Sequence, residues 1–319
     1  MQQQYSYEEV LSASERFAWR VEDLIGGERR LDFSKPFLPD SLARTNGLDF
    51  LTAEEQRVAN QIRGLGYLYT FGLVEEFILP FVLDHVRSQL NEDDYRVRAF
   101  LSFASEEAKH IQLFRRFREE FESGFGSSCG LIGPPEAVAE AVLSHHPLAV
   151  ALAILHIEWM TQRHFLDSVQ DDQTLDPQFK NLLRYHWMEE VRHAKLDTLM
   201  AEAIAATCSD KERHDAVDGY LDIGAFLDGG LAQQVELDLE SFTQATSRRL
   251  SDAERAAYLA AQRQGIRWTF IGSGMSHPTF LPRSTACGPG RASGWKQSSR
   301  RSAELSPRRE LNFQTEERE

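Results

Sequence analysis

Two stretches of the sequence share one pattern: SEEAKH at residues 105–110 and MEEVRH at residues 188–193. Each reads Glu-Glu-x-cation-His, and the spacing Glu-x-x-His occurs nowhere else in the chain. On a helix, residues three positions apart lie on one face about one turn apart, so the Glu and His of each copy can bind the same metal ion. One copy is expected by chance, but two copies with matching flanks indicate a paired site.

Both copies lie in sequence that is helical in character. Apolar residues recur at i, i+3, i+4 and i+7, and alternating β-branched runs are absent. TAEE at 52–55 and SDAE at 251–254 fit capping boxes, and Asp176-Pro177 supplies a cap and a first-turn proline. We predict an N-terminal helix at about 6–25, four long helices at about 52–90, 92–123, 147–171 and 177–207, and two or three more within about 210–270.

This array predicts an all-α fold, a four-helix bundle with accessory helices. With 319 residues the chain can form one sizeable domain. We expect a single helical domain over residues 1–283, with the bundle at about 52–207. From residue 284 the chain is rich in Gly, Ser, Pro and Arg, so we expect a disordered tail over 284–319.

Composition narrows the possible partners. The net charge of -14 disfavours nucleic acid, because an acidic protein repels phosphate backbones. The longest apolar stretch, 148–157, is too short to span a bilayer, and the N-terminus does not resemble a signal peptide. Cys129, Cys208 and Cys287 are widely scattered, as expected for reduced thiols. We therefore expect a cytoplasmic protein without a membrane partner.

A paired site in a bundle needs two further carboxylates, and the chain supplies them. The third long helix is apolar over most of its circumference, yet it carries Glu158. A buried carboxylate is costly unless it is protonated, paired or bound to metal. The first long helix offers Glu75 and Glu76, and its apolar stripe lies closest to Glu75. We choose Glu75, with Glu76 as the alternative.

Equal spacing supports this choice. Positions 75 and 107 are 32 residues apart, as are positions 158 and 190, which indicates two helix hairpins built alike. Four carboxylates and two imidazoles from four helices form a site for two iron or manganese ions, and oxygen-rich ligands suit these metals better than structural zinc. The predicted ligands are Glu75, Glu107, His110, Glu158, Glu190 and His193.

A third histidine shares the face of the second motif. His186 lies four residues before Glu190 and seven before His193, so we predict that it is a further nitrogen ligand. The alternative is an ordinary hydrogen-bonded core histidine. His156 and His164 are out of phase with Glu158 and are left out of the ligand set.

Further side chains of interest flank the ligands. Glu106 and Glu189 could accept the outer imidazole N–H across the bundle and fix the rings, the alternative being surface positions. Trp159, Met160 and Trp187 could line an apolar pocket, although core packing is commoner for such side chains. Arg192 could pair with a substrate carboxylate or with a local Glu.

The motifs resemble those of the p-aminobenzoate N-oxygenase family within the ferritin-like di-iron carboxylate superfamily. The resemblance rests on Glu75, Glu107 with His110, Glu158, and HWMEEVRH at 186–193, within about residues 52–207. It implies a ferritin-like fold, two iron ions, O2 as oxidant, a homodimer and an amine nitrogen as the atom that is oxidised. A mixed Mn/Fe pair, a small-molecule substrate and an external electron donor or reductase complete the prediction: a di-iron oxygenase that N-oxygenates a small amine or arylamine.

Three other functions fit parts of the sequence. A ferritin-like ferroxidase or peroxide-scavenging protein would use the same ligands, but the third histidine and the extra helices favour an oxygenase. Hydroxylation of tRNA by a similar bundle is disfavoured by the acidic charge. In a non-enzymatic interaction bundle, the same residues would form buried polar networks.

Overall fold

The computed structural model describes residues 5–87, 90–91 and 94–280, and within these ranges the chain is helical and forms no β-strand. The predicted all-α fold is therefore confirmed. The expected tail at 284–319, and Cys287 within it, lie outside the described residues.

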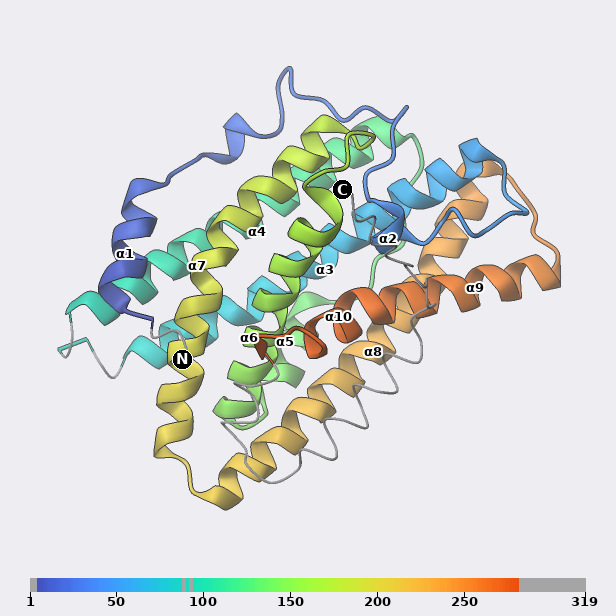
Figure 1. Ribbon diagram of the computed structural model, residues 1–319. Coiled ribbons are helices and arrows are strands. Elements are labelled where there is room, and N and C mark those ends of the chain that lie inside the picture. The colour runs from blue at the N-terminus through green and yellow to red at the C-terminus, as the bar shows by residue number, and fades with distance from the viewer. Residues whose placement is uncertain (1–4, 88–89, 92–93, 281–319) are drawn as a thin grey trace, which may run out of the picture.

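Four long helices form the bundle (Figure 1). They are α3 (Ala53–Arg87), α4 (Asp94–Phe125), α6 (Pro147–His164) and α7 (Pro177–Thr207). α3 packs along α4, and α6 packs along α7, so the bundle consists of two helix hairpins. All four predicted helices are present close to their expected ends, although the last turn of the third, Phe165–Val169, is π-helical.

The predicted caps set where these helices begin. The Asp176 carboxylate accepts the backbone N–H of Phe179 at 2.6 Å, and Pro177 opens α7. Ser251 caps α9 in a reciprocal capping box with Glu254. Because a cap fixes the first residue of a helix, it also fixes which side chains of that helix face the bundle.

The predicted N-terminal helix at about 6–25 is too long. α1 spans only Tyr7–Arg16 and packs against α4 and α7. Phe17 is extended, and a short 3-10 turn follows at Val21–Asp23. The extended segment allows Trp19 to stack on the ring of His110, with 6.1 Å between ring centroids, so tertiary packing overrides the helical pattern.

Accessory helices cover the two hairpins. α8 (Asp210–Thr246) packs on both α3 and α6, and α9 (Asp252–Arg267) packs on α8. A π-helical turn, Trp268–Gly272, leads from α9 into α10 (Ser273–Met275), which contacts α6. Shorter helices are α2 (Asp40–Ala43) and α5 (Pro135–Leu143).

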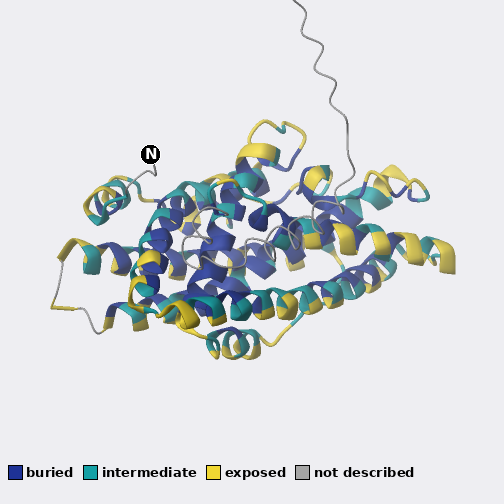
Figure 2. Cartoon of the chain, turned by 60° about the horizontal axis from the view of Figure 1, so that its bottom comes forward, coloured by how far each residue is buried: buried dark blue, intermediate teal, exposed yellow. Residues whose placement is uncertain are grey.

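The buried residues face the interior between the long helices (Figure 2). Among the described residues, α3 is the one helix that is long and apolar enough to cross a membrane by length and composition. Of its most apolar window, 61% is buried inside the protein, as is usual for the central helix of a bundle.

Candidate metal centre

The structure brings the seven predicted ligands together in the middle of the bundle. α3 and α6 contribute one carboxylate each, α4 contributes one Glu-x-x-His pair, and α7 contributes the second pair with the additional histidine. Each of the seven residues is at most 3% exposed. They are Glu75, Glu107, His110, Glu158, His186, Glu190 and His193.

Six of these residues form two overlapping sets whose donor atoms lie within 4.8 Å of one another. One set is Glu75, His110, His186 and Glu190, and the other is Glu107, His110, Glu190 and His193. Glu190 and His110 belong to both sets, so two ions held there would be neighbours. Such an arrangement is typical of two-metal carboxylate sites.

Short contacts define the inner faces of the three histidines. His193 Nδ1 lies 2.8 Å from Glu107 Oε1, and His110 Nδ1 lies 3.2 Å from Glu190 Oε1. His186 Nε2 lies 3.0 Å from Glu190 Oε1 and 3.2 Å from Glu75 Oε1. Each imidazole therefore turns one nitrogen towards the carboxylates.

Glu158 adjoins this cluster from α6 without belonging to either set of four. Burial first, and then the neighbouring Glu190 carboxylate, raise the pKa of Glu158 well above its usual value. Burial and Glu107 likewise raise the pKa of Glu75. The raised pKa values show that ionised carboxylates here are desolvated and repel one another. A bound cation would stabilise their ionised forms.

The adjacent residue Glu76 takes no part in the cluster. Its side chain is half-buried and lines a shallow hollow with Arg115 and Arg118 on the outer side of α3 and α4. The two glutamates are successive residues of one helix, so their side chains point about 100° apart. Of the two alternatives, the structure places Glu75 in the centre.

Two further carboxylates hold the outer nitrogens of the histidine rings. Glu189 Oε2 lies 2.8 Å from His110 Nε2, and Glu106 Oε2 lies 2.8 Å from His193 Nε2. Each contact crosses the bundle between α4 and α7. A ring that donates its Nε2–H outwards presents the Nδ1 lone pair inwards, which is the form that binds a metal.

The cation in each motif pairs with one of these outer carboxylates. Lys109 Nζ donates to Glu189 Oε1 at 2.5 Å, and Arg192 Nη2 donates to Glu106 Oε1 at 3.1 Å. Burial alone would raise the pKa of Glu106, but His193, Arg192 and the Ser14 hydroxyl hold it at about 2. Glu106 therefore stays ionised and anchors its histidine.

Unsatisfied polar atoms test whether a metal fits. Among the described residues, both oxygens of Glu107, one oxygen each of Glu75, Glu158 and Glu190, and Nδ1 of His110 and His193 are buried without a well-formed hydrogen bond. Leaving so many polar atoms unpaired would be costly. When all four inner carboxylates are ionised they carry four negative charges, which two divalent cations would neutralise. The residues fit a two-metal cofactor.

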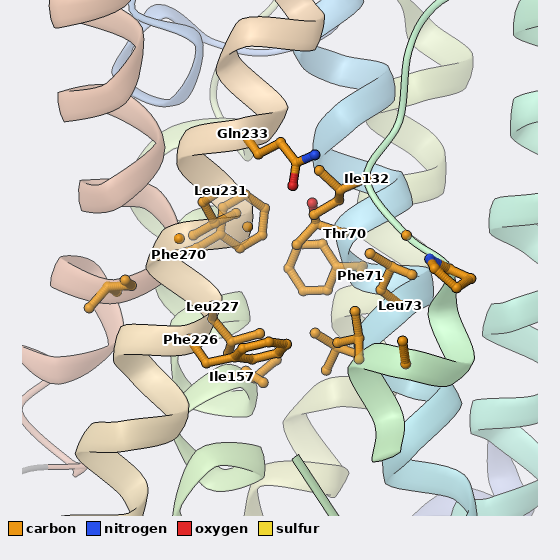
Figure 3. Close-up of a pocket in the computed structure, with 18 of the residues that line it drawn as sticks. Thr70, Phe71, Leu73, Ile132, Ile157, Phe226, Leu227, Leu231, Gln233 and Phe270 are labelled. Carbon is orange, nitrogen blue, oxygen red and sulfur yellow. The ribbon is translucent and has the colours of Figure 1, made fainter. Parts of the chain in front are cut away.

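A cavity of about 460 Å³, lined mainly by apolar side chains, lies near the cluster. Figure 3 shows its lining residues. Its wall includes Val74 and Ile157, the residues that precede Glu75 and Glu158. The rest of the lining comes from α3, α5, α6, α8, residues 132–134 and the π-helical turn. The volume lies within the range of small-molecule pockets.

A family model described as P-aminobenzoate N-oxygenase AurF matches residues 18–254. The chain belongs to this family. The match includes all four bundle helices and the whole of α8. The chain is thus an oxidoreductase of the AurF family, whose members use O2 at a di-iron centre.

Solved structures agree on the fold. The chain is similar to an R2-like ligand-binding oxidase mutant with an aerobically reconstituted Fe/Fe cofactor, at 16% identity and a TM-score of 0.51. A second mutant of that oxidase, with a Mn/Fe cofactor, gives 16% identity and a TM-score of 0.50. Each comparison covers 88% of this chain and 93% of the other. This likeness shows the ferritin-like fold alone. No curated protein sequence matches the chain.

One buried acid of this AurF-family protein was not anticipated from the sequence. Asp197 is fully buried beside the cluster, and neither of its oxygens has a hydrogen-bond partner among the described residues. Burial raises its pKa well above the usual value, which favours the uncharged form. The available signal was its position on α7, four residues after His193 and seven after Glu190, on the same helical face.

Of the residues proposed from the sequence to line a pocket, Met160 lines the cavity, whereas Trp159, Trp187 and Arg192 do not. The Trp159 ring stacks on His277, and the Trp187 ring stacks on Phe165, with centroids 5.1 and 4.5 Å apart. Arg192 is committed to Glu106 rather than to a substrate carboxylate. In each case a neighbouring side chain already occupies the interacting surface.

His156 and His164 serve other contacts. His156 Nδ1 lies 2.7 Å from the Tyr220 hydroxyl, and His164 Nδ1 lies 2.8 Å from the Tyr67 hydroxyl. Burial lowers the pKa of His156 to about 4 and that of His164 to about 3, so both stay neutral in the core.

Proposed function

We propose that the protein is a dimetal N-oxygenase that inserts one oxygen atom from O2 into an N–H bond of a small amine. The observation that carries the proposal is the cluster of four carboxylates and three imidazoles, with an apolar cavity nearby. Membership of the AurF family supports the choice of nitrogen as the atom oxidised.

The reaction balances with one external reductant. An amine R–NH2, O2, two electrons and two protons give the hydroxylamine R–NHOH and one water. Bound in this cluster, the two metal ions supply the reduction of O2. The electrons come from an electron donor or reductase partner, which is part of the proposal.

The chain's own residues position the reactants. Glu75, Glu107, Glu158 and Glu190 with the three histidines hold the ions, and Glu106 and Glu189 fix the two motif histidines from outside. Trp19 is buried and stacks on the ring of His110, so it helps to exclude water from that imidazole. The cavity offers space for a substrate beside Val74 and Ile157, the residues that precede Glu75 and Glu158.

We propose an Fe/Fe or Mn/Fe pair as the cofactor, since the structural neighbours carry these pairs. Oxygen-rich sites with imidazole suit both metals. The proposal also includes a homodimer in the cytoplasm and a single domain over residues 1–283. Light scattering coupled to size-exclusion chromatography measures the oligomeric state.

Product analysis tests the function. Protein loaded with Fe(II) under anaerobic conditions should contain two metal ions per chain. With a chemical reductant, ¹⁸O2 and a panel of amines, it should give a hydroxylamine that contains one ¹⁸O atom, detected by mass spectrometry. Glu107→Gln should abolish the product. Glu76→Gln should not, because Glu76 lies outside the cluster although it is next to the ligand Glu75 in the sequence. Rapid oxidation of excess Fe(II) to a mineral, without any oxygenated amine, would instead indicate iron handling.

A further inference from the structure

The chemistry of the residues that line the cavity indicates which class of substrate can bind there. Its described residues include no Asp, Glu, Lys, Arg or His. Aliphatic and aromatic side chains such as Leu73, Ile132, Leu227 and Phe270 surround the space (Figure 3). We infer that the substrate is an uncharged amine with an apolar body, and that the cavity rejects molecules bearing a carboxylate. This inference rests on the proposed function and names its substrate class.

The cavity lies close to the metal cluster, although none of the seven ligands is among its lining residues. Phe71 lines it and also meets the ring of His186 edge-on, with 5.4 Å between centroids. Val74 and Ile157 also line the cavity, and each directly precedes a ligand in the sequence. A molecule in this space therefore lies near the cluster, with the Phe71 ring between it and His186.

Transfer of a carboxylate into such a space would be unfavourable. A buried carboxylate without a cationic partner costs several kcal/mol, which exceeds what the apolar part of a small aryl acid gains. The neighbouring inner carboxylates, Glu75 and Glu158, would add repulsion until metal ions neutralise them. An uncharged amine has no charge to desolvate and is not repelled by the inner carboxylates.

The nearby arginines do not change this result. Arg63 is fully buried but does not line the cavity, and its guanidinium lies over the ring of Phe270 at 5.9 Å, near the opposite charge of Asp238. Arg192 pairs with Glu106 on α4. Arg267 lines a neighbouring pocket and is paired with Asp228. No described cation lines the cavity itself.

The few polar atoms of the lining suit an N–H donor. The Thr70 hydroxyl donates to the carbonyl of Gly66 at 2.8 Å, so its oxygen is left as an acceptor towards the cavity. Gln233, at the exposed end of the space, is the other polar side chain of the lining. An acceptor near an apolar pocket favours an amine over a carboxylate, which carries only acceptors.

Binding of two matched probes tests the inference. 4-Ethylaniline and 4-aminobenzoate have similar size, and they differ mainly in an apolar or an anionic para substituent. Calorimetric titration of the metal-loaded protein at neutral pH should give at least tenfold tighter binding of 4-ethylaniline. Equal or tighter binding of 4-aminobenzoate, or binding of neither probe, would overturn the inference. Loss of aminobenzoate binding in Arg63→Gln would then identify the cation responsible.

Variants of α8 place the binding site. Gly230 lines the cavity, and a side chain there would begin 3.6 Å from Ile132, so Gly230→Leu should fill the space without displacing backbone. It should weaken 4-ethylaniline binding at least tenfold. Gly224→Leu, on the same helix but outside this cavity, is the matched control and should not. The reverse result would place the substrate elsewhere and refute the proposal.

A designed cation gives a gain of function. Gln233→Arg puts a guanidinium at the exposed end of the cavity and should tighten 4-aminobenzoate binding several-fold without tightening 4-ethylaniline binding. Gln244→Arg, an exposed position farther along α8, controls for general charge. Equal effects of both variants would contradict the proposed location. If the preference for the neutral probe holds but no oxygenated product forms, the proposed function fails and the binding inference stands.

Discussion

Glu189→Gln tests whether the outer carboxylates maintain the metal-binding geometry. The Glu189 side chain is fully buried, and its two oxygens accept from His110 Nε2 at 2.8 Å and from Lys109 Nζ at 2.5 Å. Glutamine keeps the shape but replaces one acceptor oxygen with an NH2 donor. Either His110 or Lys109 must then lose its acceptor or face another donor.

The size of the effect follows from those two contacts. Partners of this kind typically change metal affinity by about 10- to 100-fold when they are removed, which is about 1.4–2.8 kcal/mol. His110 belongs to both sets of potential ligands, so the loss should affect both ions. The charge of Lys109 is also left without its buried partner, which places the effect towards the upper part of this range.

Competition against a chelating dye measures the dissociation constants of both metal ions. Glu76→Gln is the matched control, because Glu76 is a half-buried glutamate next to a ligand but outside the cluster. We expect Glu189→Gln to weaken binding of both ions and Glu76→Gln to leave them unchanged. If Glu189→Gln binds metal as tightly as the wild type, the outer carboxylate does not orient His110 and the reasoning is wrong.

Three further predictions concern stability. Burial raises the pKa of Asp238 to about 6 from 3.8, so between about pH 4 and 6 the folded state retains a proton that the unfolded state has lost. The free energy of unfolding should thus fall by up to about 3 kcal/mol as the pH rises through this window, and urea titrations of Asp238→Asn should show a smaller fall. Phe179 stacks on Phe37 and meets Phe117 edge-on, and Phe179→Ala should lower the free energy of unfolding by about 3–5 kcal/mol in denaturant titration. Ser251→Ala removes the capping box of α9 and should cost about 0.5–2 kcal/mol, seen as a lower Tm; an unchanged value in any of these cases would contradict the assigned contact.

Helical phase explains why so much of the site could be predicted. Glu107 with His110, and His186 with Glu190 and His193, are spaced by three, four or seven residues, so their common face follows from the geometry of the helix. The long helices themselves carry strong apolar periodicity and clear caps. Such local signals predict the helices and the face that their side chains share, without knowledge of the tertiary structure.

Contacts between distant segments explain what was missed. The cavity combines Thr70 of α3 with Leu231 of α8 and Ile271 of the π-helical turn, and no spacing rule links these positions. The end of α1 depends on Trp19 inserting beside His110, which is again a tertiary contact. Asp197 had a signal in its helical phase, but it lies outside the Glu-x-x-His pattern itself, and a single acid of this kind is usually a surface residue.

A constant shift of 83 residues relates the two hairpins. It carries Glu75 to Glu158 and, in the paired motifs 106–110 and 189–193, each carboxylate, cation and histidine to its counterpart. The same shift carries Phe103 to His186 and Phe114 to Asp197. The two halves therefore share the basic site, and α7 departs from it at two positions where α4 has phenylalanine.

This departure predicts that the two metal positions are unequal. His186 belongs to the set with Glu75 but not to the set with Glu107. His186→Phe restores the residue type of the other half, and aromatic neighbours already surround the ring, since Phe71 and Phe114 meet it edge-on at 5.4 and 5.1 Å. The variant should fold, keep one ion, and bind the other at least about tenfold more weakly, a loss of about 1.4 kcal/mol.

Equilibrium dialysis followed by metal analysis separates the two outcomes of His186→Phe. At a metal concentration that saturates the wild type, we expect the content to fall from two ions per chain towards one. His85→Phe, which changes a half-buried histidine of α3 outside the cluster, should keep two. If His186→Phe also keeps two ions at wild-type affinity, His186 is a packed core histidine, and the asymmetry between the hairpins lies in Asp197 alone.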